Sequence, residues 1–195
     1  MEQYTNLKNR YIIYYVVKYT GKFGFIKPWT AVRDGLTYSQ QFLSPSTLEG
    51  IEKKLFPETL TQNGVISKIK RYRLSYSSID VQQEQTQTRG FNGKKKIREK
   101  AVLNRGIMID PILYLAFEDY SEALKASKQH VCLCRNEDIL LPDSIIKEMD
   151  ESSFNSIKGF EMRFGKSRQS FMVGYNRFDN SPMYGWLEID GQSIL

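Results

Sequence analysis

The order in which strand-like and helix-like segments follow one another constrains the fold of this chain more than any other feature. Residues 10–19, RYIIYYVVKY, are rich in β-branched and aromatic side chains and predict a mostly buried strand. A helix is predicted up to Pro57, because Ser46 and Glu49 form a capping box and apolar residues follow at helical spacing. Residues 65–77 then predict a long second strand.

The same pattern resumes after a polar and basic insertion at about residues 80–106. Residues 107–117 predict a strand, Ser121 caps a short helix, and residues 131–135, VCLCR, predict the strand after it. This order is that of a ferredoxin-like (RRM-like) βαββαβ domain. We therefore expect an α+β fold over residues 1–136. The insertion after its second strand is expected to be a projecting β-hairpin or a mobile loop.

Residues 137–195 predict a smaller C-terminal part. Residues 137–156 are polar and indicate a connection with one helical turn. We expect a small β-rich extension, packed on the same domain, from three strand-like segments: residues 157–164, 171–176 and 184–190.

The insertion also contains all of the net charge. The chain carries +6, and the seventeen residues from Arg89 to Arg105 carry +6, so the other 21 basic and 21 acidic residues cancel. Clustered Lys and Arg residues are what binding to phosphates requires, and Phe91 adds an aromatic ring that can stack on a base. The simpler interpretation is a solvated surface loop. The basic residues are Arg89, Lys94, Lys95, Lys96, Arg98, Lys100 and Arg105.

Composition excludes several other classes of protein. No apolar run is long enough to span a membrane, and the first residues do not resemble a signal peptide, so we expect a cytoplasmic protein. Cys132 and Cys134 are too few for a disulfide framework and lack the common redox spacing. With one histidine, His130, no histidine-rich metal site is expected.

A second candidate segment for phosphate binding follows the first strand. The sequence GKFGFIK, residues 21–27, is similar to the signature of RNA-recognition motifs. That signature belongs on the third strand of its domain, so we do not interpret this segment as one. Lys22, Lys27 and Arg33 nevertheless lie where a glycine-containing loop can follow phosphates, and a plain strand-to-helix connection is the alternative.

Three segments carry a resemblance to a known family. In residues 21–50, G-x-F-x-F-x-K-P is followed by LTY and SPSTLEG. Arg105 precedes D-P-x-x-Y at residues 110–114, and FGKSR at residues 164–168 precedes Phe171. Together these segments resemble the Cas-five family, the CRISPR-associated subunits that cap the 5′ handle of the guide RNA (crRNA) in type I Cascade complexes.

The resemblance implies a ferredoxin-like domain with a thumb hairpin and a non-catalytic role in nucleating Cascade assembly, in antiviral defence or RNA-guided transposition. It implies as partners the crRNA 5′ handle, the backbone and large subunits, and target DNA through the complex, with no cofactor or metal. The basic residues of the insertion would grip RNA. Handle phosphates would be held by Lys22, Lys27 and Arg33 in the first loop and by Lys166 and Arg168 in the late loop.

Three alternatives stay open. His130 is the one candidate for a histidine base in a metal-independent endoribonuclease that cuts precursor RNA. The related type III effector subunits of the same superfamily are the second alternative. The third is a protein-interaction module whose basic loop binds an acidic partner.

Overall fold

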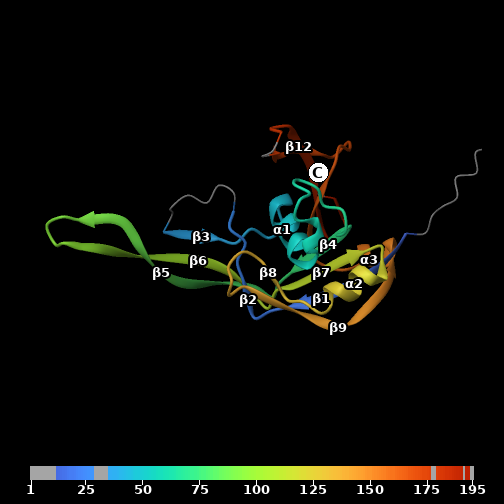
Figure 1. The fold of residues 1–195 in the computed structure, drawn as a ribbon, viewed down its shortest axis with the longest axis horizontal. Coiled ribbons are helices and arrows are strands. Elements are labelled where there is room, and N and C mark those ends of the chain that lie inside the picture. Colours follow the sequence, from blue (N-terminus) through green and yellow to red (C-terminus); the bar gives the residue numbers. More distant parts are fainter. Residues whose placement is uncertain (1–11, 29–34, 177–178, 191, 194–195) are drawn as a thin grey trace, which may run out of the picture.

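The structure, a computed structural model, describes residues 12–28, 35–176, 179–190 and 192–193, and only the backbone at 86–91, 98–101 and 192–193. Strands make up most of its regular structure (Figure 1). The strands are β1 (Ile13–Thr20), β2 (Phe23–Gly24), β3 (Leu36–Tyr38), β4 (Arg71–Ser75), β5 (Ser78–Asn92), β6 (Ile97–Ile109), β7 (Ile112–Phe117), β8 (Val131–Cys132), β9 (Ile139–Asp150), β10 (Phe160–Phe164), β11 (Phe171–Tyr175), β12 (Pro182–Ile189) and β13 (Gln192–Ser193). The helices are α1 (Pro45–Leu55), α2 (Tyr120–Ala126), α3 (Glu151–Asn155) and a 3-10 turn, η1 (Pro57–Thr59).

A large antiparallel sheet forms the body of the molecule. Its strands follow the order β11-β12-β10-β4-β7-β1-β9-β8, and β13 lies beside β12. β1 lies between β7 and β9 and pairs with both, with Tyr15 opposite Phe117 on one side and Glu148 on the other. The β-branched and aromatic residues of β1 suit this central place, since both faces of the strand are covered.

The two faces of the sheet carry separate parts of the core. Val17 and Tyr19 of β1 belong to the main cluster, which packs against α1 and α2. The Tyr19 hydroxyl donates to the Ala126 carbonyl at 2.9 Å and so fixes α2 on this face. Tyr14 and Val16 point the other way, as alternate residues of a strand do, and pack against α3.

Helix α1 is present as predicted, but the predicted capping box is wrong. The side chain that caps the helix is that of Ser44, whose Oγ accepts from the Thr47 backbone N–H at 3.2 Å. Glu49 turns instead toward the next segment, where one carboxylate oxygen accepts from the Gly64 N–H at 3.0 Å and pairs with Lys53 at 2.7 Å. The helix therefore begins two residues earlier than the sequence pattern indicates.

The expected α+β, ferredoxin-like class is also wrong, because the described chain is mostly β and its three α-helices are short. The C-terminal strands are no separate extension of a four-stranded sheet, since β10 pairs with β4 and continues the large sheet. Residues 137–156, expected as a polar connection with one helical turn, contain the twelve-residue strand β9 and the short helix α3. Most of β9 lies at the edge of the sheet and is exposed, so its polar residues resemble those of a loop.

A smaller sheet extends away from the body. Its order is β2-β6-β3, and β5 pairs with β6 from Ile109 to Ile97 in an antiparallel hairpin, including the part of β6 that pairs with β2 and β3. In Figure 1 the β5/β6 hairpin projects far beyond every other labelled element. At about 3.3 Å per residue, the fifteen residues of β5 extend over roughly 45 Å. The insertion is therefore a projecting hairpin, the first of the two forms expected.

Candidate nucleic-acid interface

The tip of the hairpin presents three consecutive lysines. Residues 93–96 form the turn, in which Lys96 adopts a positive φ of 50°. The Asn92 side-chain oxygen accepts from the backbone N–H groups of Lys94 and Lys95, each at 3.2 Å, and thereby holds the turn. All three lysines are exposed and appear in no ion pair of the described residues. The tip is thus an exposed cluster of positive charge on a backbone turn that Asn92 holds.

One face of the hairpin root carries exposed apolar and amide side chains. Val81, Gly106 and Tyr38 lie opposite one another across β5, β6 and β3, so they share a face. The Tyr38 ring lies across Gly106, where a Cβ atom would come within 2.2 Å of it, and the residue is 56% exposed. Gln83 and Asn104 continue the same face toward the tip. An exposed ring beside amide groups is suited to stacking and hydrogen bonding with unpaired bases.

The opposite face of the root carries arginines that pair with neighbouring carboxylates. Arg105 Nε lies 3.3 Å from a Glu84 carboxylate oxygen, and its guanidinium lies 5.7 Å from the centre of the Phe25 ring. Arg135 lies over the same ring at 5.4 Å and is held by the fully buried Asp138 at 2.7 Å. Arg105, predicted to grip RNA, therefore lies at the hairpin root, where its charge is paired with the Glu84 carboxylate.

The remaining predicted residues do not gather in one place. Lys22 is almost fully exposed and lies 3.9 Å from Asp110, at the end of the hairpin nearest the body. Lys27 is exposed in the segment after β2. Lys166 and Arg168 are exposed in the turn between β10 and β11, on the C-terminal part of the large sheet.

Five predicted residues are only partly or not at all accounted for. Arg33 lies outside the described residues. The backbones of Arg89, Phe91, Arg98 and Lys100 run in β5 and β6, but their side chains lie outside what is described. Their positions on the outer hairpin nevertheless place them on the same projecting element as the lysine tip.

His130 occupies the turn between α2 and β8 and is exposed. Its contact with α1 is made by its backbone carbonyl, which accepts from the Lys54 ammonium group. The hairpin basic residues belong to a different sheet from β8. The structure therefore offers no described pairing of this imidazole with the basic cluster.

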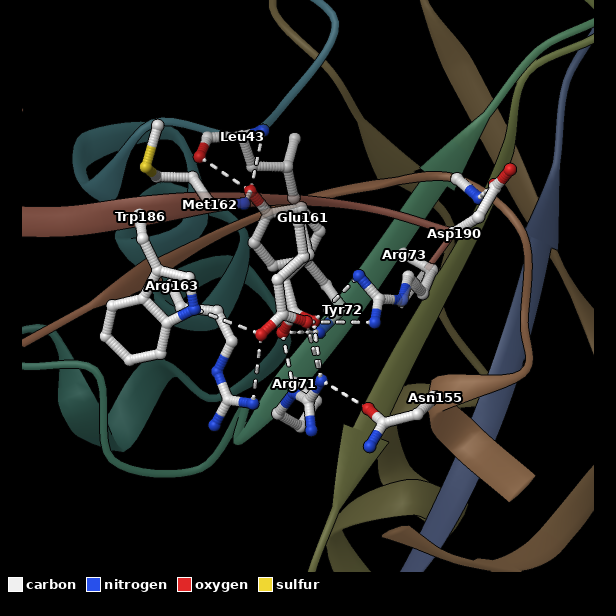
Figure 2. Close-up of polar contacts among 12 residues, drawn as sticks. Leu43, Arg71, Tyr72, Arg73, Asn155, Glu161, Met162, Arg163, Trp186 and Asp190 are labelled. Atoms are coloured by element: carbon white, nitrogen blue, oxygen red, sulfur yellow. Dashed lines mark hydrogen bonds and ion pairs between the residues drawn. The ribbon is translucent and has the colours of Figure 1, made fainter. Parts of the chain in front are cut away.

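The largest polar cluster was missed by sequence reasoning. Arg71 and Arg73 of β4 are among the largest fully buried side chains, and they converge on Glu161 of β10 (Figure 2). Arg71 binds both Glu161 oxygens, at 2.8 Å from Nε and 2.9 Å from Nη2, and Arg73 Nη1 lies 3.2 Å away. Glu188 of β12 pairs with Arg73 at 3.0 Å, and Glu151 of α3 pairs with Arg71. The alternation of Arg71, Tyr72 and Arg73 placed both guanidinium groups on one face, but nothing in the sequence identified their partners.

This network changes the ionisation of its members. Burial alone would lower the pKa of Arg71, but the hydrogen bond and the charge of Glu161 more than offset it, so the pKa is raised. Burial, together with the hydrogen bond to Glu151, raises the pKa of Tyr14 to about 12. Burial also raises the pKa of Tyr72, whose hydroxyl joins the Leu43 carbonyl to the Met162 N–H (Figure 2). With Arg163, whose Nη1 lies 3.8 Å from Glu151 and 3.6 Å from Glu188, the network holds three guanidinium groups and three carboxylates among the described residues, and it ties β4 to β10, β12 and α3.

Other kinds of site are not seen in the described part of the chain. It contains no group of three or more His, Cys, Asp or Glu residues placed to hold a metal ion. None of the described helices has the length and apolar character needed to cross a membrane. Comparison of the sequence with protein-family models and with curated proteins finds no match to either.

Proposed function

We propose that this chain is a non-catalytic, cytoplasmic RNA-binding subunit that uses the β5/β6 hairpin to grip single-stranded RNA. The observation that carries the proposal is the exposed lysine turn, Lys94 to Lys96, at the end of a projecting hairpin. The rest of the chain outside the basic segment is neutral, so attraction to a polyanion is concentrated on this element.

The hairpin root supplies the second half of the mechanism. Phosphate contacts give affinity without sequence information, whereas stacking and contacts to base edges select unpaired RNA. Tyr38, Gln83 and Asn104 share one open face of the root, and Lys94 to Lys96 lie at the tip. RNA lying along that face would meet stacking and amide groups first and cationic groups farther out.

The resemblance to the Cas-five family suggests which RNA this is. We propose the 5′ handle of a CRISPR guide RNA, held as the first step in assembling a type I Cascade complex with its backbone and large subunits. Target DNA would be reached through that complex, in defence or in RNA-guided transposition. The supporting observation is that residues 80–106 form a hairpin, the form that a thumb would take.

The salt dependence of RNA binding tests the proposal. Fluorescence anisotropy with a labelled single-stranded RNA would compare the wild type with a variant in which Lys94, Lys95 and Lys96 are all alanine. Each lost phosphate contact should flatten the slope of log K against log salt by about 0.7, or roughly 2 for all three. The matched control replaces Lys128, Lys147 and Lys158, which are exposed on other elements, and should leave the slope unchanged.

Two results would contradict the proposal. An equal change of slope in both triple variants would mean that general charge, and not the hairpin, binds RNA. Cleavage of precursor RNA in the presence of a chelator, abolished by His130→Ala, would favour the endoribonuclease. Purification from cells adds a test of identity, because a uniform short RNA with a fixed 5′ end is expected only from a guide-RNA subunit.

A further inference from the structure

A groove of about 530 Å³ lies between α1 and the C-terminal strands, away from the hairpin tip. One wall comes from the start of α1 and the segment before β4, and the other from β10, the following turn and β12. Cavities that enclose small organic groups measure about 300–1,000 Å³, so this groove has room for a nucleotide. The lining residues used below are Leu48, Ile66, Ile69, Met162, Phe164, Lys166, Met183 and Tyr184.

The groove is lined mainly by apolar side chains and by the cation Lys166. The one carboxylate among the described lining residues, Glu161, is paired with Arg71 and Arg73. Leu48, Ile66, Ile69, Met162 and Met183 contribute aliphatic or thioether groups, and Phe164 and Tyr184 contribute rings. Lys166 is exposed, and its Nζ lies 5.0 Å from the centre of the Tyr184 ring. No described carboxylate lies within ion-pair distance of Lys166, whereas Lys70 and Arg163, which also line the groove, are paired with Glu118 and Glu188.

We propose that this groove is a second RNA-contact site, which takes one unstacked base and holds its phosphate with Lys166. The inference rests on the proposed RNA binding and adds a site distinct from the hairpin. A base removed from its stack needs apolar and aromatic surroundings, and the adjoining phosphate needs a cation that no carboxylate already neutralises. The groove combines both features.

Binding to two oligomers of equal charge separates base contacts from phosphate contacts. The probes are a labelled oligoadenylate RNA of about twelve nucleotides and a matched oligomer in which every base is replaced by an abasic spacer. The variants are Tyr184→Ala, Tyr184→Phe, Lys166→Gln and Met183→Trp, the last of which fills the groove. Thermal melting identifies any variant that fails to fold, and Lys158→Gln on an exposed remote position is the control.

We expect Tyr184→Ala and Met183→Trp to weaken binding of the oligoadenylate by about 5- to 100-fold and to leave the spacer oligomer unaffected. Tyr184→Phe keeps the ring and should bind as the wild type does. Lys166→Gln should weaken both probes. In addition, an oligouridylate with 4-thiouridine should crosslink to the peptide that contains Phe164 or Tyr184.

The outcomes distinguish the groove from the hairpin. If Tyr184→Ala, Met183→Trp and Lys166→Gln bind oligoadenylate as the wild type does while the triple lysine variant of the hairpin binds weakly, the groove proposal is overturned and the proposed function stands. If the wild-type protein binds neither oligomer at low salt, both proposals fail. If Tyr184→Ala and Met183→Trp weaken binding of both oligomers equally, the groove takes no base and the groove proposal is overturned.

Discussion

At the scale of single residues, the most demanding feature is the burial of Arg71 and Arg73 in the middle of a sheet. A guanidinium group removed from water is costly unless carboxylates and hydrogen bonds surround it. The partners come from three separate elements: Glu161 and Glu188 pair with both guanidinium groups, and Glu151 pairs with that of Arg71. Because each partner lies on a different element, the ion pairs form only when those elements are correctly assembled.

The variant Glu161→Gln tests how much these buried ion pairs stabilise the folded state. The amide keeps the shape of the side chain but removes the buried carboxylate charge that both guanidinium groups contact, so we expect a loss of about 3–5 kcal/mol in the free energy of unfolding. Urea denaturation measures it. Glu137→Gln is the control, since Glu137 pairs with Arg135 at 3.5 Å on the surface and should cost less than about 1 kcal/mol. Equal losses in the two variants would show that the buried pairs add no stability.

Tyr14 makes alkaline stability a second test at this scale. Its hydroxyl donates to Glu151 at 2.6 Å, and burial raises the pKa of Tyr14 from the ordinary value of 10.0 to about 12. The folded state therefore favours the neutral phenol. The resulting stability is complete below pH 10 and is lost as the pH rises toward 12. Thermal melts should show a weaker decline over this interval in Tyr14→Phe than in the wild type. Tyr175→Phe, on an exposed residue of β11, should keep the wild-type decline.

At the scale of elements, the sequence predicted those segments whose pattern is local. β1 could be predicted because its apolar residues are continuous, and the hairpin because turn residues and charge separate it from the strands of the body. β9 could not, because an exposed edge strand carries the polar residues of a loop. The pairing of Arg71 with Glu161 joins residues ninety positions apart, and no local pattern indicates such a contact.

Excision of the outer hairpin tests how independent this element is. Residues 86–101 would be replaced by Asn-Gly, which closes the Gln85–Val102 pair with a two-residue turn. The root keeps its pairing with β2 and β3 and the contact between Arg105 and Glu84. Since a projecting two-stranded ribbon buries little surface, unfolding free energy should change by less than about 1 kcal/mol.

The same excision should remove most RNA binding, because it deletes Lys94 to Lys96. Circular dichroism and urea denaturation establish the fold, and anisotropy measures the binding. The control is the full-length variant Gly93→Asn, which changes the turn but preserves the lysines and should bind RNA normally. Full RNA affinity in the shortened protein would exclude the hairpin as the binding element.

At the scale of the whole molecule, the ionic network decides whether the C-terminal strands behave as a separate unit. β10 meets β4 through a single paired position, Phe160 opposite Leu74, so the ladder there is short. The network adds the contacts of Glu161 and Glu188 with β4, and the Tyr72 hydroxyl accepts from the Met162 N–H at 2.6 Å. Separation of the C-terminal strands would expose both arginines and this tyrosine without their partners. We therefore infer that β4 and β10–β12 unfold together.

The fluorescence of Trp186 during urea unfolding tests whether these strands unfold together. The Trp186 indole N–H donates to Glu188 at 3.1 Å, and the Arg163 guanidinium lies 5.5 Å from its ring, so its fluorescence reports the environment of β12 directly. With Trp29 replaced by Phe, Trp186 is the one remaining tryptophan. Urea transitions followed by its fluorescence and by far-ultraviolet circular dichroism should coincide, as two-state unfolding requires. A fluorescence transition at lower urea would mean that the C-terminal strands detach first.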